Sequence, residues 1–215
     1  MKINQTGRSM VEMLGVLAII GVLSVGGIAG YSKAMNKYKM NKQVQQINQI
    51  VSYLNYNRPF INTKPRQSIV PLLKKLDIIP KEMIKTNDEK YIYDVFSNRI
   101  GISDGIYGSW GNDKIITGLT FSADVLKDTT AKEACANLLN LFKEYHQDIW
   151  YIELVSSNNG STTQIFASLY GDKYCSGSNC LSKIDVKKNF DFCSKAVERS
   201  NKNENFGYNI WWLDD

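Results

Sequence analysis

At 215 residues, the chain is long enough for one compact domain and an additional segment, because domains commonly contain about 100–200 residues. Its 43% hydrophobic and 22% charged residues are typical of a globular protein, so most of the length should fold around a core. Residues 1–76 hold eleven basic residues and one acidic residue, a charge of +10, which leaves −5 of the net +5 for residues 77–215. The acidic second part argues against DNA binding, which requires a clustered basic surface.

The first expected element is a membrane segment. Residues 13–31 form an uncharged run of nineteen residues, MLGVLAIIGVLSVGGIAGY. At about 1.5 Å per residue, a helix of this length nearly crosses a hydrocarbon core of about 30 Å. A cleaved secretory signal has a shorter apolar region of about 7–15 residues, so the run favours a span, although residues 26–30 include small residues like those of a cleavage site.

A helical pattern continues beyond the apolar run. Its apolar residues recur at spacings of four, three, four and three, which places them on one face of a helix. They are Met40, Val44, Ile47, Val51 and Leu54. We expect one helix from about Met10 to Asn57, ended by Arg58-Pro59, with its first half in lipid and its second half packed on a globular head.

Residues 60–110 are rich in Asn, Pro, Gly and Ser and are predicted to form a long, partly ordered connector. It includes a short candidate helix, Ile69 to Leu76, that Ile79-Pro80 would stop. Beyond it, Thr130 and Glu133 have capping-box spacing, and Asn159-Gly160 supplies the turn of an antiparallel hairpin. The expected elements are a strand at Ile115–Phe121, a helix at Thr130–Tyr145, hairpin strands at Ile149–Val155 and Gln164–Leu169, a helix at Val186–Arg199 and a strand at Tyr208–Leu213. This pattern predicts an α+β fold, with a long N-terminal helix packed on an antiparallel β-sheet head.

The most specific signal is the segment Gly7-Arg8-Ser9-Met10-Val11-Glu12, directly before the apolar run. A carboxylate costs about 2.5 kcal/mol or more at the centre of a bilayer, so Glu12 at the edge of the span indicates a function and a partner. A short basic leader, a glycine, five residues ending in glutamate and a long apolar helix resemble the leader of type IV prepilins. The resemblance is strongest over about residues 1–58.

The resemblance implies how the chain would be processed. A prepilin peptidase would cut between Gly7 and Arg8 and methylate the new amino terminus. Glu12 would become the fifth residue of the mature chain and pair with the amino terminus of a neighbouring subunit, where both charges lose water and compensate each other. Arg8 departs from the phenylalanine or methionine usual in the family, and Ala29 stands where many members have a proline.

The implied organisation is a leader at 1–7, a transmembrane and assembly helix at 8–32, an amphipathic half at 33–58 and an α+β pilin head at 59–215. The chain would be stored in the inner membrane with its head in the periplasm, and then polymerise into an extracellular pilus. Its partners would be further copies of itself, prepilin peptidase, the pilus assembly machinery and the membrane, with no cofactor, metal or nucleic acid. Residues 76–83 and a cysteine-bearing helix look more loosely like type IVb pilins, whose leaders are usually longer.

Three alternatives remain at this point. The first is a minor tip pilin whose head binds a host, a mating partner or DNA. The second is a pseudopilin of a type II secretion system. The third is a permanent signal anchor that holds an unrelated periplasmic domain. An anchor does not need the glycine, spacer and glutamate of residues 7–12, so the pilin interpretation is favoured over the third.

The four cysteines all follow the span, and an even number in an exported domain indicates two disulfides and an oxidising compartment. They permit three pairings, between which the sequence does not decide. We favour Cys135–Cys193, joining two predicted helices, with Cys175–Cys180 closing a small loop; type IVb pilins have a bond comparable to the first. A zinc site is the alternative, but the Cys175/Cys180 spacing and the single histidine argue against it.

The charges that flank the span favour the opposite orientation, with the head in the cytoplasm. Two basic residues precede it, whereas Lys33, Lys37, Lys39 and Lys42 follow it, and the more basic flank of a membrane helix usually faces the cytoplasm. We give the cysteines more weight and place the head outside the cytoplasm.

Cys135 and His146 would share one face of a predicted helix, which suggests a thiol hydrolase. No orienting Asn or Asp and no oxyanion element accompanies them, so we expect a disulfide cysteine, a surface histidine and no enzymatic activity. The tryptophans fall into two groups: Trp150, Trp211 and Trp212 for the core or an interface, and Trp110 for packing against a neighbour.

Overall fold

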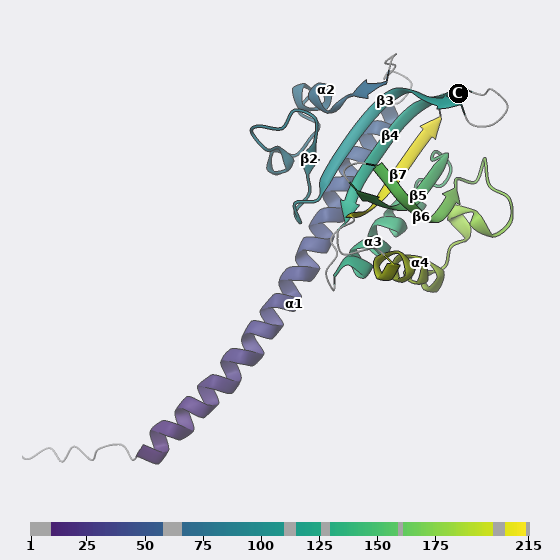
Figure 1. Cartoon of the computed structure of the whole chain (residues 1–215). Coiled ribbons are helices and arrows are strands. Elements are labelled where there is room, and N and C mark those ends of the chain that lie inside the picture. The colour runs from purple at the N-terminus through teal and green to yellow at the C-terminus, as the bar shows by residue number, and fades with distance from the viewer. Residues whose placement is uncertain are drawn as a thin grey trace, which may run out of the picture. The chain divides into compact units, whose positions relative to one another are not determined.

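The computed structural model describes residues 10–57, 66–109, 115–125, 130–158, 161–199 and 205–213. It confirms the α+β class, with a long N-terminal helix and antiparallel strands (Figure 1). The chain divides into two compact units, the first ending at Lys39 and the second beginning at Met40.

The elements have the following bounds. The α-helices are α1 (Met10–Asn57), α2 (Val70–Lys75), α3 (Ala131–Lys143) and α4 (Val186–Arg199), and the short 3-10 helices are η2 (Lys81–Met83), η3 (Gly177–Asn179) and η4 (Leu181–Lys183). The strands are β1 (Gln67–Ser68), β2 (Ile92–Tyr93), β3 (Arg99–Ser109), β4 (Ile115–Val125), β5 (Tyr151–Asn158), β6 (Ser161–Tyr170) and β7 (Asn205–Leu213).

Helix α1 has the predicted bounds, and its predicted apolar stripe is the face that packs on the head. Ile47 and Val51 are 0% exposed, and Val44 is partly buried against the same core. The pattern did not include Gln43 and Gln46, two polar residues that are also buried.

The strands described here form one antiparallel sheet in the order β1-β3-β4-β7-β5-β6, and β2 pairs with β3. The last strand, β7, lies between β4 and β5 and thereby joins the pairs β3–β4 and β5–β6 into one sheet (Figure 1). The predicted hairpin is confirmed as β5 and β6, although its Asn159-Gly160 turn lies outside the described residues. The predicted last strand is confirmed too and extends back to Asn205.

One face of this sheet, the second half of α1, α3 and α4 share a single apolar core. Alternate residues of β7 supply its largest side chains, and Tyr208 and Trp212 are each 1% exposed. The Tyr208 ring meets Phe142 of α3 edge to face, with 5.6 Å between centroids, and its hydroxyl donates to the Cys135 carbonyl. β7 therefore connects the sheet to the helices as well as the two strand pairs to each other.

The candidate helix at Ile69 to Leu76 is confirmed as α2, but the prediction of a partly ordered connector over residues 60–110 is otherwise wrong for residues 66–109. This stretch holds α2, β1, β2 and β3, and it buries Leu73, Met83 and Ile92 completely. The sequence of β3 was read as a loop because it is rich in Gly and Ser. Its isoleucines at positions 100 and 102 nevertheless alternate into the core, and β4 pairs along its length, so neighbouring strands compensate for weak intrinsic strand propensity.

Helix α3 is shorter than predicted. It ends at Lys143 instead of Tyr145, and His146 follows it in a turn. Thr130 occupies the cap position, but its backbone is already helical and its side chain makes no capping hydrogen bond, so the predicted capping box does not form. Helix α4 has the predicted bounds, Val186–Arg199.

Both disulfides join the pairs that the sequence analysis favoured. Cys135 of α3 is bonded to Cys193 of α4 with a Cα–Cα distance of 5.7 Å, and Cys175 is bonded to Cys180 at 5.1 Å. The first bond connects positions 58 residues apart. On the chain-entropy argument such a bond stabilises the fold by about 4 kcal/mol.

Candidate functional site

The residues of the proposed processing and assembly motif fall in different parts of the chain. Gly7 and Arg8 lie outside the described residues. Glu12 lies in the first turn of α1, where the partial positive charge of a helix N-terminus favours an acidic side chain.

The first half of α1 exposes its apolar side chains in every direction. From Met10 to Tyr31 the large hydrophobic residues are each 54–84% exposed. Within the described residues, α1 is the one helix long and apolar enough to cross a membrane. A helix that is hydrophobic all round requires an apolar environment, and the rest of the described chain does not supply it. By length and composition this segment is a candidate membrane span.

Glycines are frequent in the same segment without any reason inside the chain. A Cβ atom added at Gly15, Gly21, Gly26, Gly27 or Gly30 would meet nothing within 4 Å. Each glycine costs a helix about 1 kcal/mol relative to alanine. Small residues allow a neighbouring helix to approach the backbone closely in a membrane-like environment.

Polar hydrogen bonds hold the second half of α1 to the head. Gln43 Nε2 donates to Asp94 Oδ2 at 2.6 Å, and Gln46 Oε1 accepts from the backbone amide of Val95 at 3.0 Å. Asp94 also accepts two hydrogen bonds from Asn98, through the side chain and the backbone amide, each at 2.9 Å. Burial raises the pKa of Asp94, and these donors oppose the shift. Asp94 Oδ2 therefore ties the turn at residues 94–98 to α1 through Gln43, and Oδ1 closes the turn on its own backbone amides.

The beginning of this packed half carries an ion pair. Lys42 Nζ lies 2.8 Å from Glu82 Oε1 of η2. The hydrogen bond from Lys42 lowers the pKa of Glu82. Glu82 is half exposed, so the pair contributes little to stability.

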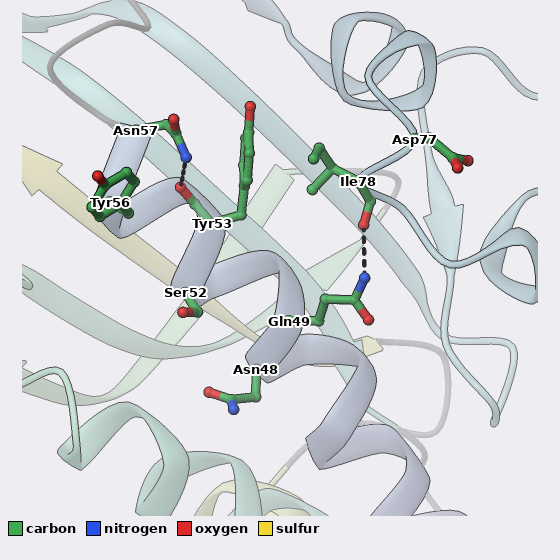
Figure 2. A pocket seen from close by; sticks show the side chains of 8 residues that line it. All are labelled: Asn48, Gln49, Ser52, Tyr53, Tyr56, Asn57, Asp77 and Ile78. Atoms are coloured by element: carbon green, nitrogen blue, oxygen red, sulfur yellow. Dashed lines mark hydrogen bonds between the residues drawn. The ribbon is translucent and has the colours of Figure 1, made fainter.

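An open groove lies near the end of α1. Figure 2 shows its lining, which comes from the last turns of α1 and from Asp77 and Ile78 after α2. Gln49 Nε2 donates to the Ile78 carbonyl at 3.2 Å, and Asn57 Nδ2 donates to the Tyr53 carbonyl at 2.9 Å. Most of the lining consists of amide side chains and tyrosines, and Ser52, Asp77 and Ile78 complete it.

The sheet face opposite the core carries an aromatic cluster. The Tyr151 ring stacks on Trp211 with 5.2 Å between centroids and lies 4.8 Å from Tyr170. Its hydroxyl donates to Glu153 Oε1 at 2.9 Å. Burial raises the pKa of Glu153, against the hydrogen bonds from Tyr151 and Asn209. Sequence reasoning expected Trp211 in a core or an interface, but it missed Glu153, because a lone acid in an apolar strand carries no local signal of burial.

The remaining candidates are placed as follows. Cys135 is bonded to Cys193 and His146 lies beyond α3, so the two do not form a nucleophile and base. His146 Nδ1 lies instead 3.0 Å from Asp172 Oδ2. Trp212 is in the core, whereas Trp110 lies outside the described residues. The described part of the chain contains no group of three or more His, Cys, Asp or Glu residues arranged to hold a metal ion.

No protein-family model matches the chain, and neither a curated protein nor a solved structure shows significant similarity to it. The structure itself shows a long N-terminal apolar helix, an antiparallel sheet that packs on the second half of that helix, and two disulfides. This architecture is compatible with a pilin.

Proposed function

We propose that the chain is the structural subunit of a type IV pilus, stored in the inner membrane by α1 and polymerised through the same helix. The observation that carries the proposal is the apolar half of α1, exposed in all directions and preceded by Glu12 in its first turn. A permanent anchor would need only length and apolarity. A helix that leaves lipid and packs on other copies also benefits from small residues and from a charged group that fixes register.

The head supports the same proposal. Two disulfides are typical of a domain that folds in an oxidising compartment, which here is the periplasm. The bond between α3 and α4 stabilises the domain without help from the first half of α1. A subunit of this kind is able to keep its head folded while the apolar helix moves from lipid into a filament.

In the filament, the Glu12 carboxylate pairs with the amino terminus of Arg8 in a neighbouring subunit. Prepilin peptidase creates that amine by removing residues 1–7. Each charge would be costly alone in an apolar filament core, and breaking a buried pair is strongly destabilising. Glu12 therefore selects the position at which a new subunit docks.

Intact-mass measurement of protein sheared from the surface of the native host tests the proposal. We expect a chain that begins at Arg8, with or without one added methyl group, and that gains four hydrogens on reduction of its two disulfides. The matched variant Glu12→Gln should be processed normally but lost from sheared filaments, because it keeps the side-chain size and removes the charge. A protein that retains residues 1–7 and occurs only in the inner membrane contradicts the proposal.

A further inference from the structure

Three lysines follow the apolar half of α1 and have no assigned role. Lys33 and Lys37 are exposed and Lys39 is half-buried. Among the residues that the structure describes, none of the three takes part in an ion pair, in contrast to Lys42. They also create the conflict noted above, because they make the flank after the span more basic than the flank before it.

The helix places these lysines at the depth of lipid headgroups. If the apolar run ends at Tyr31 at the edge of the hydrocarbon core, Lys33, Lys37 and Lys39 lie about 3, 9 and 12 Å further along the axis. Side chains on a helix tilt toward its N-terminus, which is the membrane side, so the long lysine side chains lean back toward the bilayer surface. The headgroup layer is about 5–8 Å thick on each side, within reach of all three ammonium groups.

Two further features match a membrane interface. Tyr31 and Tyr38 are 67% and 61% exposed, and a spacing of seven residues puts them on the same face of α1. Tyrosines are enriched at headgroup level, where the ring meets apolar chains and the hydroxyl meets water. Lys37 and Lys39 lie about 160° apart around the helix, so the positive charge surrounds α1 rather than marking one side.

We propose that Lys33, Lys37 and Lys39 form a lysine collar that binds the phosphate groups of anionic phospholipids while the chain is stored in the membrane. The proposal rests on the membrane placement of α1 in the proposed function, but not on filament assembly. Acidic surfaces of a second copy are the competing occupant. The lipid is favoured because the collar continues directly from the membrane-spanning residues and because its side chains lean toward that segment.

The collar also resolves the charge conflict physically. Basic residues near a surface rich in anionic lipid gain about 1 kcal/mol each. Headgroups in the outer leaflet would thus compensate the lysines that follow the span without requiring them to face the cytoplasm.

The test uses the full-length protein in nanodiscs of phosphatidylcholine and phosphatidylglycerol at a ratio of about 7:3. Electron paramagnetic resonance with spin-labelled lipids measures how strongly the protein prefers the anionic lipid at its surface. The collar variant is Lys33→Gln, Lys37→Gln and Lys39→Gln. The matched control, Lys75→Gln, Lys187→Gln and Lys195→Gln, removes the same charge from exposed positions of the head.

For the wild type we expect a preference of about twofold or more averaged over the surrounding lipids, since 1 kcal/mol is about fivefold at each contacted site. The preference should fall toward one in molar salt, where the screening length is about 3 Å. At low salt, the collar variant should lose the preference and the head control should keep it. Absence of a wild-type preference, or its survival in the collar variant, overturns the proposal.

Two further outcomes are equally decisive. Loss of the preference in the head control alone would place the lipid contact on the head and overturn the collar. Filaments weakened by the collar variant, with no lipid preference in nanodiscs, would assign the lysines to a second copy of the chain and also overturn it. Because both leaflets of a nanodisc have the same composition, neither result depends on topology or processing, so failure here is distinguishable from failure of the proposed function.

Discussion

The two halves of α1 both carry large aliphatic residues, but these residues lie in different environments. In the first half, Ile19 is 62% exposed and Leu23 is 69% exposed, whereas in the second half Ile47 and Val51 are fully buried. Ile19 and Ile47 have the same helix propensity, so propensity does not explain why one is exposed and the other buried. The difference shows that the second half is a part of the head, whereas the large apolar side chains of the first half are not buried by the part of the chain that the structure describes.

The largest expected effect comes from the disulfide between α3 and α4. Cys135→Ala with Cys193→Ala should lower the free energy of unfolding of the head by about 4 kcal/mol. In membranes the head should become sensitive to protease, while the protein remains resistant to carbonate extraction, because in the proposed function α1 alone anchors the chain in the bilayer. Loss of membrane association would show that the halves are not independent.

The second disulfide is the matched control for this experiment. Cys175→Ala with Cys180→Ala opens a loop with a sequence separation of 5, compared with 58 for the first pair. The chain-entropy argument then gives a loss of about 2 kcal/mol. Equal protease sensitivity in the two double variants would contradict the argument from loop length.

A matched pair of isoleucines tests the comparison within one helix. Ile47→Ala should destabilise the head by about 3 kcal/mol, because it leaves a cavity in the core. Ile19→Ala makes the same change in helix propensity and should leave head unfolding unchanged. Denaturation of the full-length protein in micelles, followed by tryptophan fluorescence, measures both. A comparable loss with Ile19→Ala would mean that the first half also stabilises the head.

The polar attachment of α1 should contribute less. Asp94→Ala removes the acceptor of Gln43 and of the turn at residues 94–98, and we expect a loss of about 2 kcal/mol in the same assay. Asp88→Ala is the control: its carboxylate accepts from the Tyr93 hydroxyl and from the backbone amides of Lys90 and Tyr91, but in a solvated turn, so its loss should be smaller. If the two variants are equally destabilised, burial is not what makes the Asp94 contacts strong.

The elements that the sequence predicted well are those that depend on local sequence patterns. The bounds of α1 and α4 follow from local periodicity and from a proline at position 59, so they were predictable. The hairpin of β5 and β6 is local as well. Even for α1, however, the periodicity said only which face is apolar and not what covers it.

What sequence reasoning missed depends on contacts between distant residues. Gln43 and Asp94 are separated by 51 positions, and no pattern around either residue indicates the other. The same holds for β3, whose glycines and serines suggest a loop until β4 pairs with it. Glu153 is buried only because Tyr151 and neighbouring strands surround it. Burial of polar groups is therefore the least predictable part of this fold.

The smallest effect should occur where the two halves of α1 meet. Lys42→Gln removes the ion pair with Glu82 and should cost a few tenths of a kcal/mol, about 0.2–0.5, because the pair is partly exposed. Lys37→Gln, five positions earlier, removes a charge with no ion-pair partner in the described residues and should cost nothing. Denaturation midpoints at low and molar salt compare the two, and screening should abolish the Lys42 effect.

The Lys42 effect should also depend on pH in a defined direction. Lys42 lowers the pKa of Glu82 in the folded state, so the ionised carboxylate is favoured by folding. The stabilisation is then fully present above the unfolded pKa of about 4.3 and is lost as the pH falls through the lowered pKa of the folded state. If the difference in stability between wild type and Lys42→Gln persists below this pH range, the effect comes from packing of the lysine side chain and not from its ion pair with Glu82.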